Sequence, residues 1–81
     1  MFKLNVKALA LAFGIAWGIG MLLSGLMAMS GWAARFVGVM SSVYIGFKPT
    51  LLGSLIGGVW GFFDGLIGGA IVAILYNKLA K

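Results

Sequence analysis

Two long runs of hydrophobic residues dominate the pattern of this chain. The first covers about residues 6–29 and the second about residues 51–76, and neither run alternates apolar with polar positions. A membrane-spanning helix needs about 20 mostly apolar residues, whereas the strands of a membrane barrel alternate. The pattern therefore predicts an all-α fold, a transmembrane helical hairpin that forms one membrane domain over residues 1–81.

The segment between the two runs, about residues 30–50, mixes aromatic with cationic and hydroxyl side chains. Aromatic rings and long cationic side chains favour the boundary between membrane and water. We expect an interfacial connecting segment, either a short surface helix from about Trp32 to Val43 or an ordinary loop. The residues that we expect to anchor the chain at the two interfaces are Trp32, Arg35, Phe36, Tyr44, Lys48 and Tyr76.

Composition strengthens the membrane interpretation. Of the 81 residues, 63% are hydrophobic and 9% are charged, and a soluble domain of this size could not bury so much apolar surface. The net charge is +5, but the cations lie at the edges of the predicted spans. We therefore expect contact with membrane lipid and no binding of nucleic acid.

The positions of the cations also predict the topology. Two flank the first span on its amino-terminal side, two follow the second span and two lie in the connection: Lys3, Lys7, Lys78, Lys81, Arg35 and Lys48. By the positive-inside rule, both termini of a multi-pass protein in the inner (cytoplasmic) membrane would be cytoplasmic. The bias is four side chains against two, which leaves an inverted or a dual topology open.

The residue types that most enzymes need are missing from this chain. With no Cys and no His, it has no thiolate nucleophile, no usual nucleophilic triad and no zinc or haem ligation. The thioethers of Met21, Met27 and Met29 could bind Cu(I), but Met more often fills gaps in packing. We expect no enzyme activity, no cofactor and no metal site.

Asp64 is the only acidic residue, and it lies near the middle of the second predicted span. A carboxylate at that depth costs about 2.5–3.5 kcal/mol on insertion scales, so it needs a partner, a cavity with water or a function. In one interpretation it accepts hydrogen bonds within the packed helices, the candidate donors being Trp17, Trp60, Ser24 and Ser54. In the other, one Asp64 per subunit forms a ring that selects cations or carries protons.

Both predicted spans carry small residues on one face. At 100° per residue, the second span has a glycine stripe with Ser54 and Gly58 beside it, and the first span has a shorter stripe. Such faces let backbones approach closely, and they exceed what one hairpin needs, so we expect a homo-oligomer or packing on other membrane proteins. The predicted packing glycines are Gly14, Gly18, Gly25, Gly57, Gly61, Gly65 and Gly68.

A short internal repeat relates the two spans. The five residues that end in Trp17-Gly18 match the five that end in Trp60-Gly61. Because the two helices of a hairpin run in opposite directions, the shared motif would occur once in each orientation, as in an inverted repeat. A simpler explanation is that Gly and Trp are common in membrane helices.

Six short motifs are distinctive: Lys3-Leu4-Asn5-Val6-Lys7-Ala8, Trp17-Gly18, Gly53-Ser54-Leu55-Ile56-Gly57, Trp60-Gly61-Phe62-Phe63-Asp64-Gly65, Gly68-Gly69 and Leu75-Tyr76-Asn77. With them the chain resembles a family of small bacterial two-helix membrane proteins of unknown function, some of which are labelled bacteriophage holin. The resemblance covers most of the chain. It implies a hairpin in which the Trp-Gly and Asp-Gly positions are important.

Three functions fit these features. The first is a small membrane protein that self-assembles through its Gly-rich faces into a holin-like or channel-like pore. The second is a non-enzymatic accessory subunit of a larger membrane complex. The third, by analogy with the proteolipid ring of rotary ATP synthases, is an ion-translocating ring with a carboxylate in mid-membrane.

Overall fold

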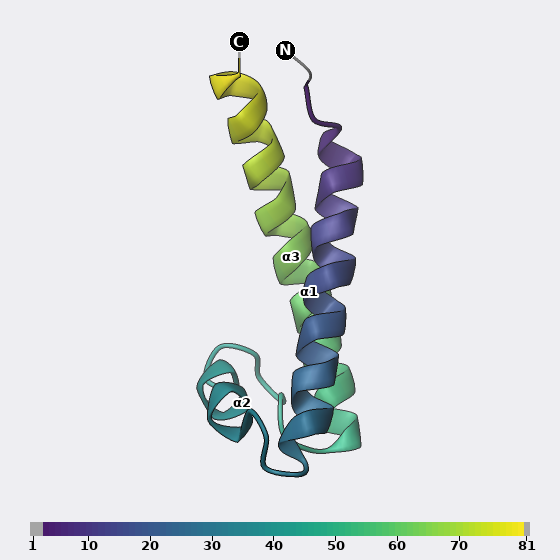
Figure 1. The fold of residues 1–81 in the computed structure, drawn as a ribbon, viewed down its shortest axis with the longest axis vertical. Coiled ribbons are helices and arrows are strands. Elements are labelled where there is room, and N and C mark those ends of the chain that lie inside the picture. Colours follow the sequence, from purple (N-terminus) through teal and green to yellow (C-terminus); the bar gives the residue numbers. More distant parts are fainter. Residues whose placement is uncertain (1–2, 81) are drawn as a thin grey trace.

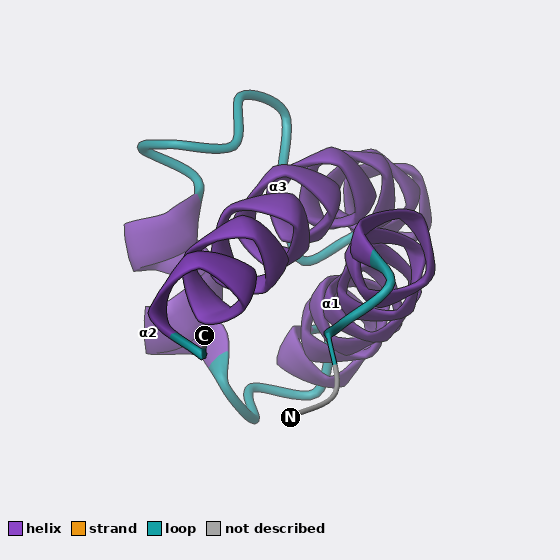
Figure 2. Ribbon diagram, turned by 90° about the horizontal axis from the view of Figure 1, so that it is seen from above, coloured by secondary structure: helices purple, strands orange, loops and turns teal. Residues whose placement is uncertain are grey.

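The computed structural model describes residues 3–80 and contains three helices, α1 (Val6–Ala28), α2 (Ala34–Met40) and α3 (Leu51–Leu79). Figure 1 shows α1 and α3 as an antiparallel pair, with the short α2 beside the end where they are connected. Seen from above, α2 again lies to one side of this pair (Figure 2). The expected all-α helical hairpin is confirmed within the described residues.

Helices α1 and α3 are each long and apolar enough to cross a membrane. At 1.5 Å per residue they extend about 35 and 44 Å, against a hydrocarbon core of about 30 Å. Each begins at a side-chain cap, because Asn5 accepts from the Ala8 amide and Thr50 accepts from the Gly53 amide. At the end of the hairpin away from the connection, Asn77 accepts from the Leu4 amide and donates to the Leu4 carbonyl, which ties residue 4 to the last turns of α3.

Small residues let the two long helices touch through their backbones. A Cβ atom added at Gly14 would lie 2.8 Å from the Phe62 carbonyl oxygen, and one at Gly18 would lie 2.9 Å from the Gly58 carbonyl oxygen. A Cβ at Gly61 would lie 3.1 Å from the Cα of Gly18. The two Trp-Gly motifs of the internal repeat therefore meet where the helices pack together.

The buried stripe on α3 follows a spacing of four residues and differs in one position from the predicted stripe. It comprises Gly53, Gly57, Gly61, Gly65, Gly69 and Ala73. Gly68, which we expected in the stripe, has no atom within 4 Å of an added Cβ, whereas Gly69 lies against Ala10 and Phe13. Beyond Gly65, α1 continues to contact α3 at intervals of four residues. The next contact is therefore at Gly69, four residues after Gly65, and not at Gly68, three residues after it.

The connecting segment contains a shorter helix than the sequence predicts, and it does not simply lie across the end of the hairpin. After α2, residues 41–50, which we call the return segment, turn back along the first half of α3. Phe47 lies against Gly57, and the backbone of Lys48 lies against Gly53. Gly46 has φ +91°, a backbone angle that favours glycine, and it makes the turn between Tyr44 and Phe47 possible.

A small apolar core fills the space between the return segment, α2 and the adjoining half of α1. It consists of Met21, Ala28, Val37, Tyr44 and Phe47, with Met40 packed against it. Phe47 is 0% exposed and Tyr44 is 2% exposed. The glycine faces that we expected to hold several copies together are therefore largely covered within one chain, by α1 and by the return segment.

We predict that Gly65→Leu destabilises the hairpin while Gly68→Leu does not. A Cβ at Gly65 would lie 2.8 Å from the Cβ of Trp17 and 2.9 Å from the Cα of Gly14, and backbone cannot move aside as a flexible side chain can. Overpacking of this kind costs about 1–3 kcal/mol. Thermal unfolding in detergent, followed by circular dichroism, measures the difference. Equal melting temperatures for the two variants would show that α1 and α3 do not meet at Gly65.

Candidate functional site

Asp64 lies near the middle of α3 and is joined to the other two parts of the fold by hydrogen bonds. Its Oδ2 atom accepts from the Tyr44 hydroxyl of the return segment at 2.5 Å. The same hydroxyl accepts from Nε1 of Trp17, the central residue of α1, at 3.1 Å. This Trp17–Tyr44–Asp64 network connects α1, the return segment and α3 at one level of the hairpin.

A second tryptophan fixes the neighbouring residue of the return segment. Nε1 of Trp60 donates to the carbonyl oxygen of Ile45 at 2.9 Å. The Trp60 ring also stacks on Tyr44, with ring centres 5.8 Å apart and planes 8° from parallel. The two tryptophans of the internal repeat thus donate to consecutive residues, Tyr44 and Ile45, and together they hold the return segment against the hairpin.

The Tyr44 hydroxyl is buried and has two hydrogen-bond partners, the donor Trp17 and the acceptor Asp64. The folded protein therefore favours the neutral hydroxyl, which can accept from Trp17 and donate to Asp64 at the same time. At neutral pH Tyr44 acts as a hydrogen-bonding group and not as a charged one.

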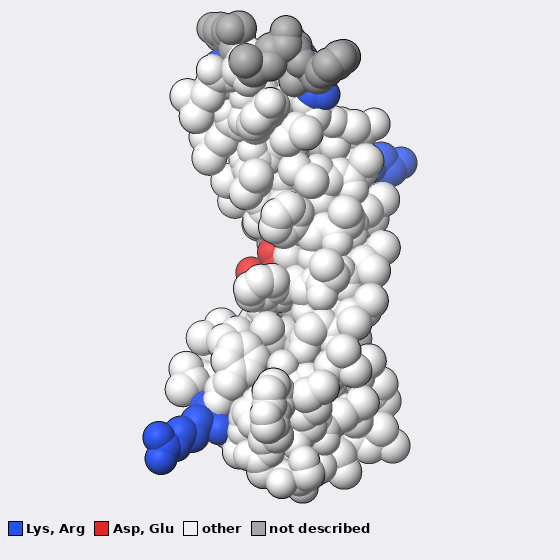
Figure 3. Space-filling view, in the orientation of Figure 1, with Lys and Arg blue, Asp and Glu red and all other residues white. Residues whose placement is uncertain are grey.

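Although Asp64 is hydrogen-bonded, its side chain is exposed. Figure 3 shows Asp64 on the surface of a concave waist between the connected end and the upper part of the two helices. The hollow on one side of it, about 230 Å³, is lined by residues that include Phe13 and Trp17. The hollow on the other side, about 210 Å³, is lined by residues that include Trp60 and Phe63. We call these two hollows, with Asp64 between them, the Asp64 notch.

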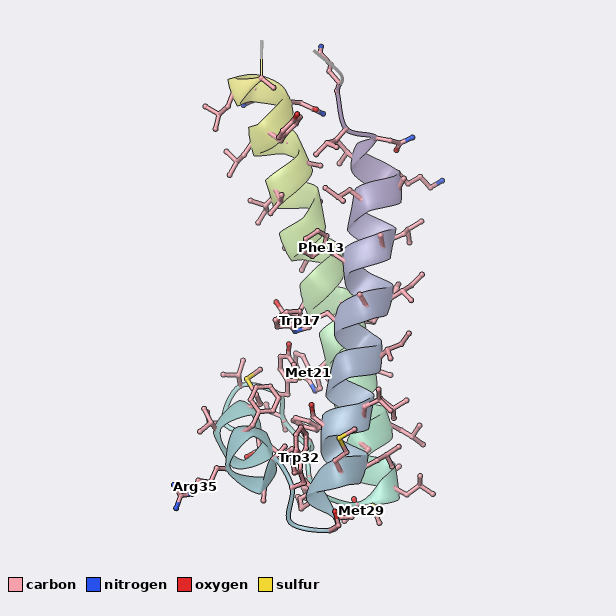
Figure 4. The ribbon with its side chains drawn as sticks, viewed as in Figure 1. Phe13, Trp17, Met21, Met29, Trp32 and Arg35 are labelled. Carbon is pink, nitrogen blue, oxygen red and sulfur yellow. The ribbon has the colours of Figure 1, made fainter. Side chains whose placement is uncertain are left out.

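The Lys and Arg side chains of residues 3–80 lie outside this notch. In Figure 3 the Lys and Arg side chains lie toward the two ends of the molecule, and Asp64 lies between them. The sequence left open that Arg35 might fold inward, but Figure 4 shows Arg35 pointing outward from α2. Within residues 3–80, Oδ1 of Asp64 accepts no hydrogen bond. The carboxylate thus has one neutral partner, Tyr44, and one free oxygen.

The hydrogen-bond donors that we expected for Asp64 all have other acceptors. Trp17 donates to Tyr44, and Trp60 donates to Ile45. The two serines bond to carbonyl groups one turn back in their own chain, Ser24 to Gly20 and Ser54 to Thr50. Asp64 is therefore hydrogen-bonded, as one of the two interpretations proposed, but through a residue that was not among the candidates.

Tyr44, which we expected as an anchor at the membrane interface, is 2% exposed and bonded to Asp64. The structure buries it beside Asp64 because the return segment runs back along α3. The other expected anchors, Trp32, Arg35, Phe36, Lys48 and Tyr76, are exposed. The sequence indicated only that a polar residue in mid-span needs a hydrogen-bond donor, and it did not identify Tyr44 as that donor.

Comparison with known proteins gives no relative from which a function could be transferred. No family model, no curated protein and no solved structure matches this chain. The resemblance to two-helix proteins described above stays a prediction. The function has to be argued from the geometry of the notch.

We predict that Tyr44→Phe lowers the stability of the hairpin by about 1–3 kcal/mol, because it leaves both Trp17 Nε1 and Asp64 Oδ2 without a partner. Tyr76→Phe is the matched control, since Tyr76 is exposed near the end of α3. Unfolding by a denaturing detergent, monitored by tryptophan fluorescence, gives both values. If both substitutions have the same small effect, the network does not stabilise the fold.

Proposed function

We propose that the protein is a small integral membrane protein, in the inner (cytoplasmic) membrane with both termini cytoplasmic, whose copies associate to form a channel-like path for cations. The observation that carries this proposal is the exposed carboxylate of Asp64 at the middle of α3. A single hairpin would turn this group toward hydrocarbon. Copies arranged with their notches inward would instead place one carboxylate per copy along a shared polar path.

The return segment supports the same arrangement. Non-helical backbone at membrane depth is tolerated where it is buried in protein or lines a cavity with water. Here it lies next to Asp64, and the carbonyl of Ile45 is satisfied by Trp60. A short helix followed by a return segment would therefore form part of the wall of the path in each copy.

The surface for association differs from the one that the glycine pattern suggested. The stripe from Gly53 to Ala73 is occupied by α1 and the return segment, so copies would meet through the notch side. The resemblance to two-helix proteins labelled holin points to the same class of function. No catalytic chemistry and no cofactor are part of this proposal.

A second candidate, the accessory subunit of a larger membrane complex, is favoured by one specific observation. Oδ1 of Asp64 has no partner within the described chain, and a cationic or hydroxyl side chain on a helix of another protein could occupy it. In that case one copy of the hairpin would bind one partner, and the isolated protein would conduct no ions.

We predict that the purified protein conducts cations in liposomes and that Asp64→Asn lowers this flux about tenfold or more. The substitution keeps the size of the side chain and its ability to accept from Tyr44, but it removes the charge that concentrates cations. Ser24→Ala is the control, because Ser24 bonds only to its own helix at Gly20. Flux that Asp64→Asn leaves unchanged would contradict the carboxylate path, and no flux in the unsubstituted protein would favour the accessory subunit.

A further inference from the structure

We propose that the Asp64 notch binds a small organic cation, an ammonium group with apolar substituents, between its carboxylate and its aromatic rings. This inference deepens the proposed function by naming the ligand class of the same site. It is a statement about binding by a single hairpin, and it can be tested without any measurement of flux.

The Asp64 notch contains one carboxylate group. Asp64 is the one acid among 81 residues, and its only hydrogen-bond donor in the described chain is the neutral hydroxyl of Tyr44. A carboxylate in apolar surroundings gains most from a cation beside it, because charges attract more strongly where water is scarce. The Lys and Arg side chains of the described residues lie away from the notch, so none of them supplies this cation (Figure 3).

The walls of the Asp64 notch are largely aromatic. Four large aromatic side chains with accessible surface line the notch, two in each hollow: Phe13 and Trp17, Trp60 and Phe63, which are 41%, 46%, 40% and 55% exposed. In Figure 4 Phe13 and Trp17 follow one another along α1. Aromatic faces attract cations through their quadrupole, and they are the usual means by which proteins recognise quaternary ammonium groups.

Within the described residues, the notch offers too few oxygen ligands for a tightly bound inorganic ion. Ca²⁺ takes six to eight oxygen ligands and Mg²⁺ requires a near-octahedral set. Residues 3–80 hold no group of three or more potential His, Cys, Asp or Glu ligands. The Tyr44 hydroxyl already accepts from Trp17 and donates to Asp64, so the notch offers little beyond one carboxylate. An ammonium ion with apolar substituents needs fewer oxygen ligands and gains from ring contacts.

The size of the notch limits the ligand. Its two hollows measure about 230 and 210 Å³. Sites for drug-sized molecules usually measure about 300–1,000 Å³, so each hollow fits a smaller cation. Benzyltrimethylammonium, which combines a quaternary nitrogen with one ring, is a suitable probe.

The test is isothermal titration calorimetry of benzyltrimethylammonium into the full chain in maltoside micelles, with empty micelles as the blank. We expect saturable binding that equal concentrations of potassium chloride do not abolish. Asp64→Asn should weaken it about tenfold or more, because the attraction between opposite charges is lost. Circular dichroism would show that the substituted protein keeps its helices.

Two further variants examine the aromatic walls. Trp60→Leu should weaken binding about 2- to 30-fold. Because this substitution also removes the bond to Ile45, Phe63→Leu serves as a variant that removes a ring but no hydrogen bond. Trp32→Leu is the matched control, since Trp32 is exposed on the connecting segment outside the notch, and it should leave binding unchanged.

Equal binding by the unsubstituted protein and by Asp64→Asn would overturn the inference, and so would complete displacement by potassium. The outcome is separate from that of the proposed function. Cation flux without saturable binding of the probe would overturn the organic-cation site and leave the channel. Saturable binding without any flux would support the site and count against the channel.

Discussion

The structure depends on the need to satisfy one carboxylate and two indole N–H groups in the middle of two apolar helices. In the structure none of these three groups is hydrogen-bonded to another residue of α1 or α3. The return segment supplies both partners from consecutive residues, the hydroxyl of Tyr44 and the carbonyl of Ile45. A buried polar group without a partner costs several kcal/mol in hydrocarbon, so this requirement is strong enough to draw an otherwise exposed connection back along α3.

Small residues make this arrangement sterically possible. Each glycine of the stripe on α3 removes a side chain at a position where another backbone or a ring lies, first Lys48 and Phe47 of the return segment and then α1. The stripe on α3 therefore contacts the return segment along its first part and α1 along the rest. This explains why a hairpin with so many glycines need not use them to bind further copies, and why association would have to use the notch side.

The hairpin could be predicted from the sequence because it follows from composition and from the lengths of the apolar runs. The bounds of α1 and α3 agree with those runs to within a few residues. The glycine contacts at Gly14, Gly18 and Gly61 also followed from helical spacing, whereas Gly68 did not, because the crossing of the helices selects a four-residue spacing. The position of Tyr44 could not be predicted from local pattern, since it depends on a contact between residues 20 positions apart that only the return of the chain creates.

The most direct measurement is a cross-link that reports how far the return segment extends along α3. Val43 and Ile67 line the same hollow, while Leu52 lies 15 residues before Ile67, a distance of about 22 Å along the helix. The chain has no Cys, so two variants can be compared cleanly, one with cysteines at positions 43 and 67 and one with cysteines at 43 and 52. A short bifunctional thiol reagent should join 43 to 67 within one chain and should not join 43 to 52. A connection that lies on the membrane surface would give the opposite result.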